Sequence, residues 1–187
     1  MNKKYELTDE TKGIGRITLH RIRALMDISR YGVRAGDIGG WIEAESNLSQ
    51  NDDAWVGDDA RVYGNAKVCG NAWVSGEAWV CGNAWVYGDA RVYGEALVNG
   101  NAEVSGNAEV KSIRDYAVFK NGWSSGRWFT YTRSNRMWRV GCFRGTGEEL
   151  IAKAYKDSEL SGKCYEAIVR AAETIEAAQA ETKGEAK

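Results

Sequence analysis

Residues 111–146 interleave arginine with aromatic residues, and these side chains are the ones in the chain best suited to bind a ligand. The segment carries eight lysines and arginines against one acid, Asp115. Guanidinium groups hold phosphate through paired hydrogen bonds, and aromatic rings stack on nucleobases at about 1–3 kcal/mol each. The pattern favours a planar anion, and the predicted ligand-binding residues are Arg114, Lys120, Trp123, Arg127, Trp128, Tyr131, Arg133, Arg136, Trp138, Arg139 and Arg144.

A structural explanation of the same segment stays open beside this one. The aromatic residues could form the core of a small domain, while the arginines pair with acidic groups elsewhere in the chain. Two alternating runs predict a hairpin across Ser134 and Asn135. On its first strand Trp128, Thr130 and Thr132 share one side, and Arg127, Phe129, Tyr131 and Arg133 share the other. Long nucleic acid is not expected as a partner, because the net charge of the whole chain is −1.

Catalytic and metal-binding combinations of residues are missing from the sequence. His20 is the one histidine, and it lies on the polar side of an alternating run. The cysteines form no CxxC pair and are typical of free thiols in a reducing cytoplasm; they are Cys69, Cys81, Cys142 and Cys164. We therefore expect no catalytic residue, no metal site and no cofactor.

A strict six-residue repeat precedes the basic aromatic segment and must position its side chains. Valine recurs every six residues, ten times from Val56 to Val110, within the pattern Ala-x-Val-x-Gly-Asn/Asp/Glu. Alanine and valine alternate with the variable residues, so both point inward from a short strand, and glycine turns the corner. Three units close a coil of eighteen residues, and the next coil stacks about 4.8 Å above it.

Residues eighteen apart then form ladders on the outside of the coils. The predicted ladders are Trp55, Trp73, Arg91 and Glu109; Arg61, Trp79 and Leu97; and Lys67, Trp85 and Glu103. Exposed tryptophans mark contact surfaces. We expect Trp55, Trp73, Trp79 and Trp85 to lie in an interface between subunits or, alternatively, in a ligand-binding groove between them.

This repeat resembles the hexapeptide-repeat family of left-handed parallel β-helices, over about residues 41–112. The resemblance implies a left-handed helix of roughly four coils and a homotrimer. It also speaks against an enzyme. Acyltransferases of the family use a histidine and a long protruding loop, and no histidine follows His20 while no insertion interrupts Val56–Val110. The γ-class carbonic anhydrases need three histidines for zinc, and this chain has one.

The two ends complete the predicted architecture, which is mainly β. Residues 1–40 alternate as a small β cap, residues 41–112 form the β-helix, and residues 113–187 form an α+β domain of basic aromatic hairpin and two helices. Thr146 and Glu149 fit a capping box. The second helix carries an apolar stripe formed by Leu160, Cys164, Ile168, Ala171, Ala172 and Ile175.

The opening of the chain, from Tyr5 to Ser49, resembles uncharacterised hexapeptide-repeat proteins that are frequent in phages and prophages. Its polar N-terminus predicts no signal peptide and no membrane segment, so we expect the cytoplasm of a bacterial host. The first hypothesis is a non-catalytic oligomer that sequesters a phosphorylated, nucleotide-like signal of antiphage defence. The alternatives are a module that inhibits or scaffolds a host protein, and an atypical acyltransferase.

Overall fold

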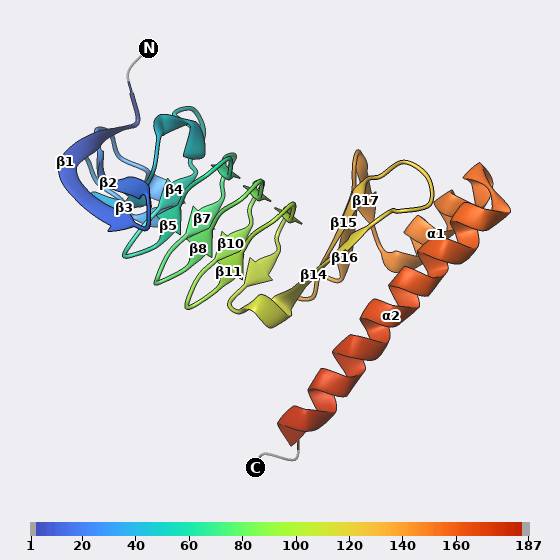
Figure 1. Ribbon diagram of the computed structural model, residues 1–187. Coiled ribbons are helices and arrows are strands. Elements are labelled where there is room, and N and C mark those ends of the chain that lie inside the picture. Colours follow the sequence, from blue (N-terminus) through green and yellow to red (C-terminus); the bar gives the residue numbers. More distant parts are fainter. Residues whose placement is uncertain (1–2, 185–187) are drawn as a thin grey trace. The chain divides into compact units, whose positions relative to one another are not determined.

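The structure is a computed structural model that describes the backbone of residues 3–184 and the side chains of residues 3–180. The chain divides into two compact units, residues 1–115 and residues 116–187 (Figure 1). The first unit contains the six-residue repeat, and the second contains the basic aromatic segment and the helices.

The first unit is a parallel β-solenoid of about four coils, as the six-residue period predicts. Figure 1 shows the coils stacked one upon another in the green part of the chain. Ten two-residue strands each end on one of the ten periodic valines. They are β4 (Trp55–Val56), β5 (Arg61–Val62), β6 (Lys67–Val68), β7 (Trp73–Val74), β8 (Trp79–Val80), β9 (Trp85–Val86), β10 (Arg91–Val92), β11 (Leu97–Val98), β12 (Glu103–Val104) and β13 (Glu109–Val110).

The strand register confirms the predicted ladders of eighteen residues. Trp55 pairs with Trp73, then Arg91, then Glu109. The other two ladders follow the same spacing, through β5, β8 and β11 and through β6, β9 and β12. Inside the coils the repeated alanines and valines are at most 1% exposed. Because both side chains are small, the coils enclose a narrow, fully apolar core.

The N-terminal strands continue one side of the solenoid. β1 (Tyr5–Ile14) and β2 (Ile17–Ala24) form an antiparallel hairpin, and β2 pairs with β3 (Ile38–Ile42), which runs parallel to β5. The resulting sheet has the order β1-β2-β3-β5-β8-β11. Two short 3₁₀ turns, η1 (Ser29–Tyr31) and η2 (Glu45–Asn47), interrupt the connections.

A buried lysine fastens the start of β1 to the first coil. The Lys4 side chain is inside the unit, and the residue is 3% exposed. Its Nζ donates to the carbonyl oxygens of Asp52 at 2.9 Å and Ala54 at 2.6 Å. Burial lowers the pKa of Lys4 to about 8, although Asp52 and Asp53 oppose that shift. The next residue, Tyr5, donates its hydroxyl to the Leu48 carbonyl at 2.7 Å.

Acidic side chains accept hydrogen bonds from the corner amides of the first coils. Glu43 accepts from the Gly64 N–H at 2.7 Å, Asp52 from Gly70 at 3.2 Å, and Asp58 from Gly76 at 2.9 Å. Each carboxylate therefore satisfies a corner amide. Corner asparagines bridge later coils, from Asn65 to Asn83 and from Asn83 to Asn101. The repeat ends at η3 (Ile113–Asp115).

The second unit is a four-stranded antiparallel sheet with two helices. The strands lie in the order of the chain: β14 (Tyr116–Lys120), β15 (Trp128–Thr132), β16 (Met137–Val140) and β17 (Phe143–Gly145). β15 and β16 form the predicted hairpin across Ser134 and Asn135. The helices are α1 (Gly147–Asp157) and α2 (Glu159–Gly184), and the predicted capping box of Thr146 and Glu149 begins α1.

The buried side of α2 differs from the predicted stripe. Ile168 and Ala172 of the stripe contact the core, together with Val169, which the stripe left out, whereas Leu160 and Ile175 are 62% and 46% exposed. The stripe prediction is therefore confirmed in its middle and wrong at its two ends. The cause is that α2 is apolar over a wide arc, so spacing alone does not show which part of the arc meets the sheet.

Candidate anion-binding face

The sheet of the second unit has one side against the helices and one side away from them. The helix side carries two rows that cross the strands: Phe119, Phe129, Val140 and Phe143; and Ala117, Tyr131, Trp138 and Gly145. Most of these residues form the core with Leu150, Ile151 and Val169 of the helices. Side chains alternate along a strand, so the remaining positions point to the other side. We call that side the outer face; it comprises Tyr116, Val118, Lys120, Trp128, Thr130, Thr132, Met137, Arg139 and Arg144.

The outer face brings together four of the predicted ligand-binding residues. Arg139 and Arg144 are direct cross-strand neighbours on β16 and β17. Lys120 is the neighbour of Trp128 on β14 and β15, with its Nζ 5.3 Å from the centre of the indole ring. Trp128 is 38% exposed, which is high for a tryptophan. None of the nine residues of the outer face is acidic, and three of them are cations.

Backbone carbonyls hold one of the two arginines in place. Arg139 Nη1 lies 3.4 Å from the Cys142 oxygen, in the turn between β16 and β17, and 3.5 Å from the Phe143 oxygen, at the start of β17. These contacts are long and use one end of the guanidinium group. The group has five N–H donors in all, so it can hold several partners at once.

Three of the aromatic residues that were predicted to bind the ligand lie in the core of the unit instead. Tyr131 and Trp138 are buried with their ring centres 4.9 Å apart, and Trp123 packs against Phe129 and Tyr165. The Tyr131 hydroxyl donates to Glu176 at 2.6 Å, and burial together with this bond raises the pKa of Tyr131. These rings account for the sheet–helix packing, as the structural explanation of the segment requires.

The other predicted cations are spread over three places. Arg133 donates to Gln179 of α2, and Arg136 lies 3.4 Å from Glu176 on the same helix. Arg127 is exposed beside Gly141, at the edge of the sheet. Arg114 belongs to η3 in the first unit. The structure thus does not gather these four with the outer face.

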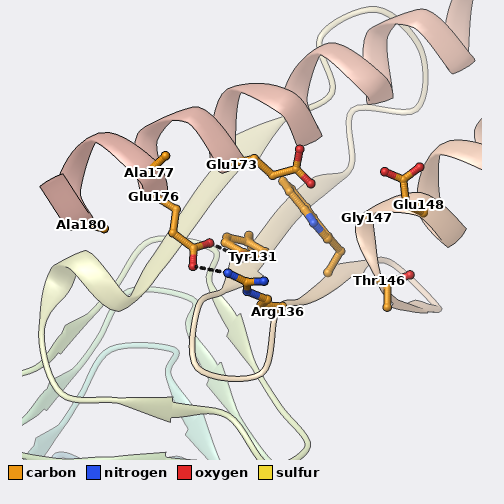
Figure 2. A pocket seen from close by; sticks show the side chains of 10 residues that line it. Tyr131, Arg136, Thr146, Gly147, Glu148, Glu173, Glu176, Ala177 and Ala180 are labelled. Carbon is orange, nitrogen blue, oxygen red and sulfur yellow. Dashed lines mark hydrogen bonds and ion pairs between the residues drawn. The ribbon is translucent and has the colours of Figure 1, made fainter.

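A cavity of about 470 Å³ lies on the helix side, between the hairpin, the start of α1 and the C-terminal half of α2 (Figure 2). Its charged lining is three carboxylates and one guanidinium group, from Glu148, Glu173, Glu176 and Arg136. Arg170 pairs with Glu148 at 2.7 Å and Glu173 at 3.0 Å, and Figure 2 shows Arg136 and Tyr131 both directed at Glu176. A cavity with this lining does not suit an anion. Its three glutamates lie on α1 and α2. The sequence did not predict that these residues lie beside the hairpin.

The outward tryptophans of the solenoid differ in their exposure. Trp55 is 2% exposed under the N-terminal strands, Trp73 lies 4.3 Å from the ring of Tyr31, and Trp79 carries the Arg61 guanidinium group 4.7 Å above its ring. Trp85 is 41% exposed. The first three therefore have covering residues from the same chain.

Among the side chains of residues 3–180, no three His, Cys, Asp or Glu residues are placed so that they could hold a metal ion together. Within the same range, neither α1 nor α2 has the length and apolar composition of a membrane-crossing helix.

The comparison with known protein families supports the solenoid fold of the first unit. The chain is a β-solenoid repeat protein. Two observations show this: the parallel strands of the first unit and a match to one family model. That model describes a YdcK beta solenoid repeat, and it matches residues 60–76, slightly less than one coil. No curated protein matches the chain.

Proposed function

We propose that this protein is a non-catalytic binding protein that captures a phosphorylated, nucleotide-like small molecule on the outer face. The observation that carries the proposal is the grouping of Lys120, Trp128, Arg139 and Arg144 on one side of the sheet, with Trp128 38% exposed. Arginine forks bind phosphate through two parallel hydrogen bonds, and an exposed indole offers a stacking surface to a base.

The spacing of these groups suits a single nucleotide. Phe129 pairs with Val140, so the position opposite Trp128 is Gly141, and Arg139 is its diagonal neighbour. Diagonal neighbours in an antiparallel pair lie about 7–8 Å apart. One nucleotide can span that separation with its base on Trp128 and its phosphate at Arg139 and Arg144. Lys120, beside the indole, would add charge without geometric selectivity.

The wider setting that we propose rests on resemblance rather than on this surface. The hexapeptide repeat favours a left-handed course of the coils and a homotrimer. The opening segment of the chain favours a phage-type protein. In such a protein, capture of a nucleotide signal would protect the phage from antiphage defence, and no turnover of the ligand is needed.

Equilibrium binding to a panel of mono- and dinucleotides tests the proposal. Arg139→Gln and Arg144→Gln should each weaken binding about 10- to 100-fold, since each removes a charge-assisted hydrogen-bond pair of about 1.5–3 kcal/mol. Trp128→Ala should weaken it about 5- to 100-fold through the lost stack.

Arg136→Gln is the matched control, because Arg136 is an exposed arginine in the turn between β15 and β16 that pairs with Glu176 on the helix side. Binding should be unchanged in this variant within a factor of two or so. If Arg136→Gln weakened nucleotide binding as much as Arg139→Gln does, the outer face would not be the site.

A further inference from the structure

The cavity on the helix side of the second unit has the size of a small-molecule site. Its volume of about 470 Å³ falls within the roughly 300–1,000 Å³ that ligand pockets span. All of its lining residues come from the unit of residues 116–187, from the β15–β16 hairpin on one side and from the start of α1 and from α2 on the other. A ligand held there contacts the sheet and both helices, and it touches no residue of the outer face.

One part of the cavity wall is apolar. Tyr131 and Trp138 are cross-strand partners, and their ring centres lie 4.9 Å apart. Ala177 and Ala180 belong to the stretch of α2 that passes over Tyr131 (Figure 2). Because alanine side chains are short, the helix leaves room beside the two rings. This part of the cavity therefore suits a flat, apolar group, which aromatic rings contact favourably.

Two of the three carboxylates of the wall depend on a single cation. Glu148 and Glu173 pair with Arg170 at 2.7 Å and 3.0 Å, and both contacts use the same nitrogen, Nη1. Arg170 itself is not among the lining residues of the cavity. Because one positive charge offsets two negative ones, this end of the cavity favours a further cation.

The third carboxylate, that of Glu176, has a weak partner on one of its two oxygens. Oε2 accepts a hydrogen bond from the Tyr131 hydroxyl at 2.6 Å. Oε1 lies 3.4 Å from Nη2 of Arg136, which is long for a hydrogen bond. The Glu176 side chain is 20% exposed, whereas that of Arg136 is 78% exposed. Exposed ion pairs contribute little to stability, so this arginine can turn into the solvent at small cost.

We propose that the cavity binds a small organic cation, a protonated amine with a flat apolar body. The ammonium group replaces Arg136 beside Oε1 of Glu176, while Tyr131 keeps its bond to Oε2. Such a charge-assisted hydrogen bond is strong at a carboxylate that is largely removed from solvent. The apolar body lies along Tyr131 and Trp138, whose rings also attract a positive charge. The three carboxylates repel an anion of the same shape.

This site is independent of the proposed nucleotide site. The cavity lies on the helix side of the sheet, whereas Lys120, Trp128, Arg139 and Arg144 lie on its other side. The two ligands differ in charge and do not compete for space. Failure of one proposal therefore leaves the other standing.

A matched pair of probes tests the charge requirement on the full-length protein. Tryptamine is protonated at pH 7, and tryptophol has a hydroxyl group in place of the amine. In a titration followed by nuclear magnetic resonance, tryptamine should shift the assigned indole signal of Trp138 in a saturable manner. Tryptophol should bind at least about tenfold more weakly, because it lacks the charge-assisted bond. Equal binding of the two probes, or no saturable shift with tryptamine, would overturn the proposal.

Two substitutions with opposite expected effects test the position of the amine. Glu176→Gln should weaken tryptamine binding about 10- to 100-fold, since it removes the charge but keeps an acceptor for the Tyr131 hydroxyl. Arg136→Gln should strengthen it about two- to fivefold, because the competing cation is gone. A damaged fold does not produce such a gain.

Glu166→Gln is the matched control for Glu176→Gln. Glu166 is another glutamate of α2 that accepts from a tyrosine hydroxyl, that of Tyr155 at 2.8 Å, but it does not line the cavity. Tryptamine binding should stay within about twofold of the parent in this variant. Unchanged binding in Glu176→Gln, a loss as large in Glu166→Gln, or weaker binding in Arg136→Gln would contradict the proposed site.

Discussion

At the scale of single residues, the corner glycines of the solenoid meet two separate requirements. Gly88 has a φ of +69°, where side chains other than glycine are strained. A Cβ at Gly88 would also lie 2.9 Å from the Gly106 nitrogen of the next coil. Gly100 has the same backbone conformation, with a φ of +66°, but nothing lies within 4 Å of a Cβ there.

Substitutions at these two glycines distinguish the cost of backbone strain from the cost of a clash with the next coil. Gly100→Ala should lower the free energy of unfolding by about 1–2 kcal/mol, which is the conformational cost alone. Gly88→Ala should lower it by roughly 3 kcal/mol or more, since the coil above must also move. Urea unfolding of both variants measures the difference. Equal losses would mean that the close approach between coils contributes nothing.

Single residues also mark the limit of prediction from the sequence. Alternation along residues 127–133 correctly placed Trp128 and Thr130 on one side of the strand and Phe129 and Tyr131 on the other. It did not show which side the helices cover, because both sides carry aromatic residues and hydrogen-bonding groups. That choice decides which arginines share the outer face. Arg139 and Arg144 lie on it, while Arg133 and Arg136 contact α2.

At the scale of elements, a buried lysine attaches the start of β1 to the solenoid. The pKa of Lys4 is lowered from 10.5 to about 8, so between about pH 8 and 10.5 the unfolded chain binds this proton more tightly than the folded one. Stability then rises with pH across that window, since the cost of the buried charge disappears as the amine loses its proton.

The pH dependence of unfolding with and without Lys4 checks this attachment. From pH 7.5 to 9.5, the parent protein should gain about 1–2 kcal/mol relative to Lys4→Met. Lys3→Met is the control, because Lys3 forms an exposed pair with Glu45 at 2.6 Å, and its profile should run parallel to that of the parent. A Lys4→Met profile parallel to the parent would contradict the lowered pKa.

Elements also differ in how far their sequence predicts them. The strands β4 to β13 can be predicted from the six-residue period, the corner glycines and the inward valines, because the same pattern repeats without interruption. The start of α1 follows from a local capping box. The packing of α2 does not follow, since its buried side is selected by residues of β15 and β16 that are distant in sequence.

At the scale of the whole molecule, the chain combines a regular scaffold with a basic sheet. Residues 41–110 carry three basic and eleven acidic residues, whereas residues 111–146 carry eight basic residues and one acid. The sequence predicts this separation directly. The anion-binding surface within the basic segment needed the strand register, because it gathers residues from four strands.

Native mass spectrometry of freshly purified protein tests the central claim most directly. We predict that the parent chain retains a nucleotide-sized anion, which denaturation releases for identification. The Arg139→Gln, Arg144→Gln double variant should lack it, while Arg136→Gln should keep it. An unliganded parent protein that also fails to bind every nucleotide of the panel would contradict the proposed function.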